Sequence, residues 1–108
     1  MAKYIYIAGP VTGLEQEVAK AAFDKAAEQI RRKHGNAVVV INPMEFIGPG
    51  EDWNYAMRKC LEKMMVCNYI HTLPGWTESK GARLEVTVAM ALHFGVCDKE
   101  YNLKEYGK

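Results

Sequence analysis

The sequence predicts one α/β domain, a three-layer sandwich in which helices cover both faces of a mainly parallel sheet. Short apolar runs alternate with amphipathic segments along the chain, and turn residues close each run. Strands that alternate with helices form right-handed βαβ units, which makes neighbouring strands parallel. The chain has 108 residues, of which 49% are hydrophobic. That length suits one core, so residues 1–108 are expected to form a single domain.

The first third of the chain reads as strand, helix, strand. Residues 3–8 (KYIYIA) are rich in β-branched and aromatic side chains, and Gly9-Pro10 closes them. Residues 12–15 (TGLE) have capping-box spacing before a helix over residues 15–33. The apolar face of that helix holds Phe23, Ala26, Ala27 and Ile30. Residues 37–41 (AVVVI) form a continuous apolar run, which predicts a strand buried on both faces.

The rest of the chain repeats the alternation. Asp52 is a candidate cap for a helix from Trp53 to about Val66. The inner side of this helix is expected to hold Trp53, Met57, Cys60, Leu61, Met64 and Met65. Residues 68–73 (NYIHTL) read as the third strand, and Ser79 caps a helix that runs to about Phe94. The tail from Val96 is expected to hold a short edge strand.

The expected sheet has four or five strands in the order 2-1-3-4(-5). In such a sheet the topological switch point lies between strands one and three, and ligands bind outside the carboxyl ends of the strands there. Two loops meet at that crevice, residues 9–13 and residues 73–80. The sequence therefore predicts the binding site in these loops.

Composition excludes several classes of function. The formal net charge is +1, and the one basic cluster, residues 31–33, is explained by a helix end. Nucleic acid and membrane partners are therefore not expected. The three cysteines form no C-x-x-C pair, which favours reduced thiols in the cytosol. The histidines and cysteines lack metal-ligand spacing, so no metal site is expected.

Residues 79–85 (SKGARLE) carry the strongest chemical signal. Ser79 and Gly81 at a helix start offer a hydroxyl and free backbone N–H groups, which suit a phosphate. Glu85 follows about 9 Å along the helix at 1.5 Å per residue, with small residues one turn away on the same face. An ionised, accessible glutamate is a nucleophile for a sugar carbon. A glutamate is also common near helix starts for electrostatic reasons alone, and serine is a common cap.

Three further residues have two readings each. Tyr6, in the first strand, either packs in the core or acts at the crevice. Trp76, on a short turn, is suited to stack on a base or to anchor its loop. Trp53, at a helix start, suits the core better than the crevice.

Five segments together resemble the nucleoside 2-deoxyribosyltransferase-like superfamily, especially its small, functionally unassigned bacterial and phage members. The segments are YIAGPVTG (6–13), VINP (40–43), MR (57–58), LPGW (73–76) and SKGARLE (79–85). The resemblance covers the chain up to about Val96. It implies a flavodoxin-like (Rossmann-like) fold and a homodimer or larger homo-oligomer.

The resemblance also implies roles for individual residues. Glu85 would attack the anomeric carbon of a ribose or deoxyribose, and Tyr6 would orient its carboxylate. The substrate, a nucleoside or nucleoside monophosphate, would be bound by Gly9, Pro10, Thr12, Gly13, Asn42, Trp76, Ser79 and Gly81. The implied activity is N-glycosidic bond hydrolysis or deoxyribosyl transfer by carboxylate chemistry, which needs no cofactor.

The sequence departs from the family pattern at three places. The aspartate that assists departure of the base is replaced by Cys60, and the one that opens strand three is replaced by Asn68. A thiol has an unperturbed pKa near 8.5, so it is a poor substitute for a carboxylic acid. The tail after Val96 has no serine to complete a neighbouring subunit's phosphate site. These departures leave a second hypothesis open, a nucleotide-binding or sensing module without turnover, and a third, an interaction domain with a vestigial crevice.

Overall fold

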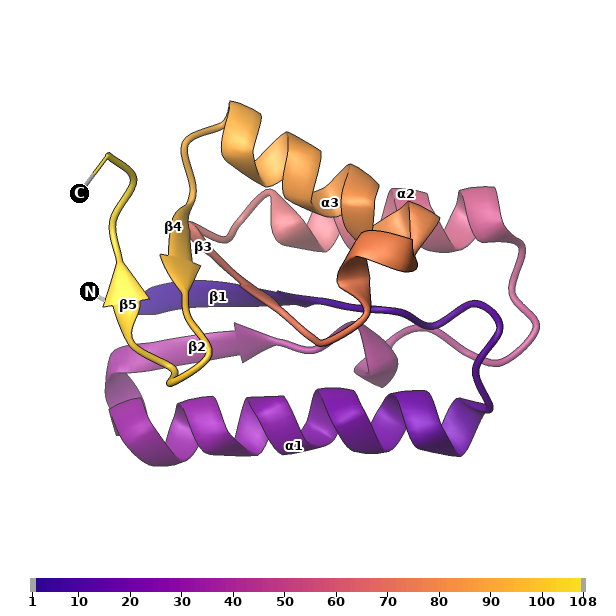
Figure 1. The fold of residues 1–108 in the computed structure, drawn as a ribbon, viewed down its shortest axis with the longest axis horizontal. Coiled ribbons are helices and arrows are strands. Elements are labelled where there is room, and N and C mark those ends of the chain that lie inside the picture. Colours follow the sequence, from indigo (N-terminus) through magenta and orange to yellow (C-terminus); the bar gives the residue numbers. More distant parts are fainter. Residues whose placement is uncertain (1, 108) are drawn as a thin grey trace.

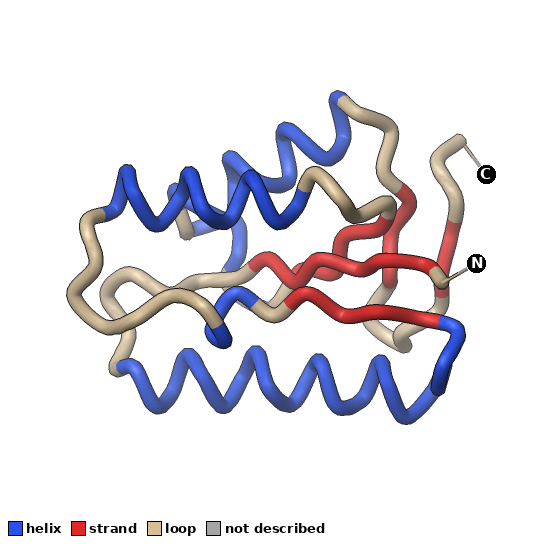
Figure 2. Tube along the Cα trace, turned by 180° about the vertical axis from the view of Figure 1, so that it is seen from behind, coloured by secondary structure: helices blue, strands red, loops and turns tan. Residues whose placement is uncertain are grey.

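A computed structural model describes residues 2–107 as a five-stranded sheet between two layers of helices. The strands are β1 (Lys3–Ala8), β2 (Val38–Ile41), β3 (Tyr69–Thr72), β4 (Gly95–Cys97) and β5 (Leu103–Lys104). Their order is β2-β1-β3-β4-β5, parallel except for β5, which confirms the predicted order and the predicted edge strand in the tail. Helix α1 (Gln16–His34) covers one face, and α2 (Trp53–Met64) and α3 (Lys80–Ala91) cover the other (Figures 1 and 2).

The alternation of side chains along β1 divides the core into two halves. Ile5 and Ile7 pack toward α1 in one hydrophobic cluster, whereas Tyr6 and Ala8 pack toward α2 and α3 in the other. This is the period of two that a strand imposes on its side chains. Tyr6 therefore lies beneath the two helices that also border the predicted crevice.

Three helix ends test the predicted capping residues. Asp52 accepts a hydrogen bond from the Tyr55 N–H at 3.1 Å, and Ser79 accepts one from the Ala82 N–H at 3.2 Å, so both predicted caps are confirmed. The predicted capping box is wrong. Glu15 is the N-cap residue of α1, and its side chain makes no capping hydrogen bond.

Element boundaries differ from prediction at three further places. Residues 38–41 are buried mainly on one face, because β2 is the edge of the sheet, and Val39 is exposed. Met65 lies beyond the last residue of α2 and is also exposed. Helix α3 ends at Ala91, since the chain turns through a left-handed His93 (φ 61°) into β4.

Candidate active site at the ends of β1 and β3

The centre of the predicted crevice is a hydrogen bond between β1 and α3. The Tyr6 hydroxyl donates to Oε2 of Glu85 across 2.5 Å. Tyr6 is fully buried and Glu85 is 5% exposed, so this contact lies at the base of the site. Residues 79 positions apart, on a strand and on a helix, thus place two titratable side chains together, as the resemblance implied.

Burial controls the charge of this pair. Loss of solvent raises the pKa of Glu85 from its ordinary value of 4.5 to about 7, although hydrogen bonds from Tyr6 and Cys60 lower it. Burial and the nearby Glu85 charge raise the pKa of Tyr6 well above its ordinary value of 10. The expectation of a fully ionised carboxylate therefore needs correction. Glu85 lies in the second turn of α3, where the helix dipole has largely faded, and desolvation prevails.

Cys60 on α2 is the third polar group at the base of the site. It is buried, and burial raises the pKa of its thiol to about 11, with the Glu85 charge acting in the same direction. The thiol is therefore protonated at neutral pH. It can hydrogen-bond to the pair, but it is a far weaker acid than a carboxyl group at this position would be.

Above this base lies a cavity of about 460 Å³, here called the Glu85 cavity. Its walls are the β1–α1 loop, the loop between η2 (Pro43–Glu45) and α2, the first turns of α2, and the start of α3. Both Glu85 and Cys60 line it. A volume of this size is within the range of small-molecule sites.

The start of α3 approaches α2 closely because residue 81 is glycine. A Cβ at Gly81 would lie 3.0 Å from Sδ of Met57 and 3.8 Å from Nε1 of Trp53. The missing side chain leaves the backbone of the first helical turn open toward the cavity. Ser79 also lines the cavity, and because its oxygen serves as the helix cap, its hydroxyl hydrogen is the group left to donate.

The structure brings most of the predicted site residues together and separates three of them. The cavity is lined by Gly9, Thr12, Gly13, Ser79, Gly81 and Glu85, with Tyr6 behind Glu85. Pro10 does not line it. Asn42 is buried elsewhere, donating to Asp24 at 2.8 Å and accepting from the Met44 N–H at 3.0 Å. Trp76 packs against the α2–α3 half of the core and lines a different cavity.

The sequence reasoning missed one wall of the cavity. Residues 47–51, in the loop after β2, line it, and Trp53 lines it although a core position was favoured for this residue. Lys80 lies 4.2 Å from the centroid of the Trp53 ring, a cation–π contact at the start of α3. The sequence contained an indication of this wall. The Gly-Pro-Gly run at residues 48–50 lies in the loop after a strand, as do the two loops that were predicted to form the site.

Two further classes of feature are absent from the described part of the chain. Among residues 2–107, no group of three or more His, Cys, Asp or Glu side chains is arranged to hold a metal ion. In the same residues, no helix combines the length and apolar character needed to cross a bilayer.

Comparison with family models assigns the chain to a family. Residues 3–98 match a domain of unknown function (DUF4406), so the chain belongs to this family. No curated protein and no solved structure matches the chain. The matched range contains Tyr6, Cys60 and Glu85, and it stops before β5.

Proposed function

We propose that this member of the DUF4406 family cleaves or transfers at the N-glycosidic bond of a nucleoside or nucleoside monophosphate. Glu85 is the nucleophile and Tyr6 its positioning partner. The observation that carries the proposal is the Tyr6–Glu85 hydrogen bond at the base of a ligand-sized cavity that also receives the amino end of α3. The resemblance described above supplies the substrate class.

The proposed reaction has two steps. The Glu85 carboxylate attacks the anomeric carbon, the bond to the base nitrogen breaks, and the base leaves with that electron pair and takes up a proton. A glycosyl ester on Glu85 results. Water or the nitrogen of a second base then attacks the same carbon, loses a proton, and releases the carboxylate. No step requires a metal or an organic cofactor.

The two ends of the substrate have different surroundings in this proposal. The first turn of α3 presents backbone N–H groups beside Ser79 and Gly81, a suitable site for a phosphate or a sugar hydroxyl. Trp53 and the residue 47–51 loop line the same cavity, and the indole ring, next to Gly81 at the start of α3, is the surface on which a base can stack.

Mass spectrometry tests the activity directly. A panel of nucleosides and nucleoside monophosphates is incubated with the protein, and free base is measured. Glu85→Gln keeps the shape of the side chain but removes the nucleophile, so release of base should fall by about 10³-fold or more. Glu62→Gln, at an exposed position on α2, is the control and should retain activity. Base release from the panel no greater than that of Glu85→Gln would eliminate the enzymatic proposal.

The pH dependence adds a signature of the nucleophile. Only the ionised carboxylate attacks, and burial raises the pKa of Glu85 to about 7. Base release should therefore increase as pH rises from 6 to 8. A rate that is flat over this interval would contradict Glu85 as the titrating nucleophile.

The alternative, nucleotide binding without turnover, is favoured by one observation. Cys60 places a protonated thiol where the resemblance implies a carboxyl group. Calorimetry should then show binding of a nucleotide that remains intact. Cys60→Asp should create base release if the rest of the site is competent, whereas Cys60→Ser, the matched polar control, should not.

Assembly and location are part of the same proposal. Helices α2 and α3 carry exposed apolar side chains, among them Tyr55, Leu84 and Met90, which are candidates to pack against a second copy of the chain. Light scattering after size exclusion should give a mass of at least two chains. A cytoplasmic location is proposed because the three cysteines are free thiols.

A further inference from the structure

A second cavity lies on the opposite face of the sheet, between α1, the loop after β3 and the β4–β5 turn. It has a volume of about 670 Å³ and is here called the His71 cavity. The residues that matter for its chemistry are Lys25, His71, Trp76, Lys99 and Tyr101. None of its lining residues lines the Glu85 cavity, so the two are separate sites.

His71 presents one unpartnered ring nitrogen to this cavity. The residue is 5% exposed, and its Nδ1 lies 2.9 Å from the carbonyl oxygen of Cys97. Because a carbonyl only accepts, Nδ1 carries the hydrogen and Nε2 is left as an acceptor. Within residues 2–107 the only side-chain hydrogen bond of the imidazole is that of Nδ1, and Nε2 is open to solvent in the cavity rather than a buried atom left without a partner. An acceptor that is open to a cavity and has no protein partner can receive a hydrogen bond from a ligand or from water.

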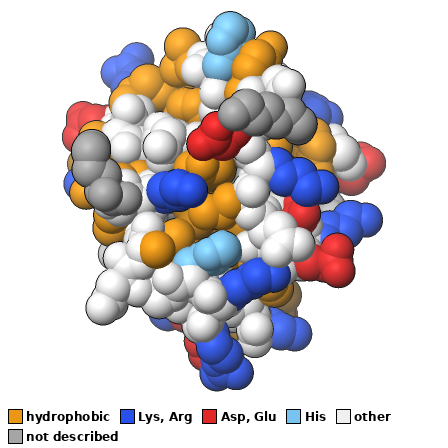
Figure 3. Space-filling view, turned by 90° about the vertical axis from the view of Figure 1, so that its left-hand side faces the viewer, with side chains coloured by type: hydrophobic (Ala, Val, Ile, Leu, Met, Phe, Trp, Pro, Cys, Tyr) orange, Lys and Arg blue, Asp and Glu red, His pale blue; other side chains and the backbone are white. Residues whose placement is uncertain are grey.

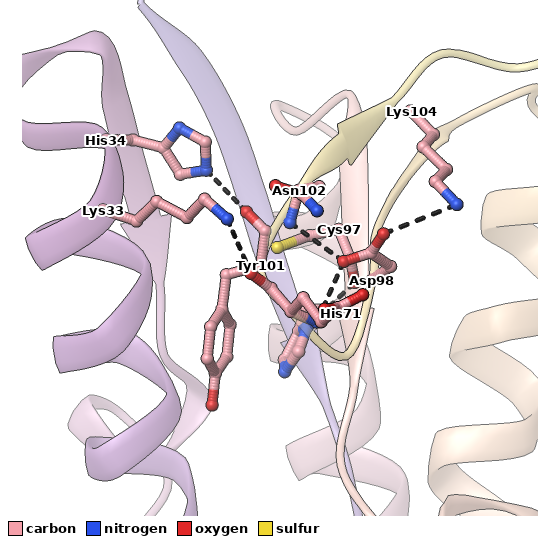
Figure 4. A network of polar contacts seen from close by, with 9 residues as sticks. Lys33, His34, His71, Cys97, Asp98, Tyr101, Asn102 and Lys104 are labelled. Carbon is pink, nitrogen blue, oxygen red and sulfur yellow. Dashed lines mark hydrogen bonds and ion pairs between the residues drawn. The ribbon is translucent and has the colours of Figure 1, made fainter.

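The ring of Tyr101 is held beside this imidazole. The two ring centroids are 5.3 Å apart. Tyr101 has a left-handed backbone (φ 66°), which is unfavourable for a bulky residue. In Figure 4 the Tyr101 hydroxyl and the free nitrogen of His71 point the same way, away from Lys33 and His34.

The strained turn at Tyr101 is fixed from two sides. Oδ1 of Asp98 accepts hydrogen bonds from the N–H groups of Glu100 and Asn102, each at 2.9 Å. His34, at the end of α1, lies 2.6 Å from the Tyr101 carbonyl oxygen (Figure 4). The Tyr101 ring is thus positioned in advance at the mouth of the cavity.

The charge of the cavity is positive. Lys25 and Lys99 both line it, and no acidic side chain does. Neither lysine has an ion pair with a residue in the described range, in contrast to Lys20 and Lys59, which bind Asp24 and Glu51. Two such cations match the charge of a phosphate monoester, which carries about −1.5 to −2 at neutral pH.

We propose that the His71 cavity is a second binding site, for a phosphate monoester that also carries a planar ring with an N–H or O–H donor. The phosphate binds Lys25 and Lys99, the ring packs against Tyr101 with Trp76 at the edge of the cavity, and the donor binds Nε2 of His71. This proposal concerns the α1 face and does not depend on chemistry at Glu85.

The two tryptophans allow each cavity to be observed alone. The chain has two, Trp53 at the Glu85 cavity and Trp76 at the His71 cavity. In Trp53→Phe, the fluorescence of Trp76 reports the His71 cavity. Adenosine 5′-monophosphate is the probe, with adenosine (the ring without the anion) and inorganic phosphate (the anion without the ring) as comparisons. The monophosphate should give a saturable change, with an affinity about tenfold or more above that of either comparison.

Substitutions identify the groups responsible. In the Trp53→Phe background, replacing Lys25 and Lys99 by alanine should weaken the monophosphate about tenfold. The control Lys63→Ala, on α2 and outside both cavities, should not. His71→Phe keeps a ring but removes the acceptor, so it should weaken the monophosphate and leave inorganic phosphate unchanged.

The reciprocal variant separates this proposal from the proposed enzyme function. In Trp76→Phe, Trp53 reports the Glu85 cavity, and the double lysine substitution should leave its response unchanged. The proposal is overturned if the monophosphate gives no saturable change in Trp76 fluorescence, or if the change survives loss of both lysines. Base release by the wild-type protein would stand in either case.

Discussion

The two cavities follow one plan on opposite faces of the same sheet, around a buried acid in one and a buried base in the other. Each is built around a buried titratable side chain that lies against a tyrosine: Glu85 with Tyr6, and His71 with Tyr101. Tyr6 donates a hydrogen bond to the carboxyl group, whereas Tyr101 contacts the imidazole only through its ring. Both pairs lie in the inner layers that flank the sheet. Figure 3 shows the surface at the left-hand end of Figure 1, where charged and hydrophobic side chains lie next to one another.

Burial shifts the pKa of an acid and the pKa of a base in opposite directions. Burial raises the pKa of Glu85 and lowers the pKa of His71, so both groups are driven toward their neutral forms. Ionisation then costs stability at high pH on one face and at low pH on the other.

Glu85→Gln should stabilise the protein at high pH. The native pKa of about 7 lies above the unfolded value near 4.5, so native protein holds a proton that unfolded chain releases between these values. Wild-type stability should fall as pH rises through this window. The difference in unfolding free energy between variant and wild type should therefore grow by about 3 kcal/mol from pH 4 to pH 8. Urea denaturation at the two pH values measures it. A constant difference would mean that Glu85 is not desolvated as described.

Gly9→Ala should disturb the wall between the cavities. A Cβ at residue 9 would lie 2.8 Å from Cβ and Cδ1 of Leu73, where β1 and β3 end side by side. The overlap forces the two loops apart and should cost about 2 kcal/mol. Gly48→Ala is the matched control in the Glu85 cavity, because nothing lies within 4 Å of a Cβ there. Equal thermal stability of the two variants would contradict the close approach.

Tyr6→Phe should remove the donor without changing the fold. The buried carboxyl loses its hydrogen bond from the hydroxyl, which should cost about 1 kcal/mol or more. Since that bond lowers the pKa of Glu85, the pKa should rise above 7, and the pH window of lost stability should extend upward. Carbon-13 NMR of the Glu85 carboxyl during a pH titration measures this shift. An unchanged midpoint would show that the hydroxyl does not stabilise the charged form.

The sequence predicted those parts of the fold and site that depend on local pattern and on one topological rule. The caps at Asp52 and Ser79 are local, because each side chain accepts a hydrogen bond from an N–H three residues further along the chain. The rule that ligands bind at the carboxyl ends of the strands selected the loops around Glu85. The Tyr6–Glu85 contact was suggested by a resemblance, because no local pattern joins positions 79 apart.

The His71 cavity was beyond such reasoning for a physical reason. The turn that places Tyr101 beside His71 depends on a left-handed tyrosine, a conformation its side chain disfavours. Several hydrogen bonds hold that turn in place. Those from Lys33 and His34 of α1 reach backbone carbonyl groups 67 positions away in the chain, and the one from the Asn102 N–H ends on the Asp98 side chain. Trp76 was assigned to the Glu85 cavity because its loop follows β3. The chain instead turns through a left-handed Gly75 (φ 86°), and Trp76 packs against the α2–α3 half of the core and lines the His71 cavity rather than the Glu85 cavity.

His71→Gln should reduce the loss of unfolding free energy that occurs as the pH falls. Burial lowers the pKa of His71, against the carbonyl of Cys97 and the charge of Asp98, which raise it. Unfolded chain therefore binds a proton below about pH 6.5 that native protein resists, and wild-type stability should fall as pH decreases there. Glutamine keeps a donor for the Cys97 carbonyl but has no charge to gain.

The variant should lose less stability than wild type between pH 7 and pH 5, in a direction opposite to the effect of Glu85→Gln. The effect is the smallest of the four because it is confined to this acid range. Equal losses in variant and wild type would place the imidazole in water and remove the basis for the contrast between the two faces.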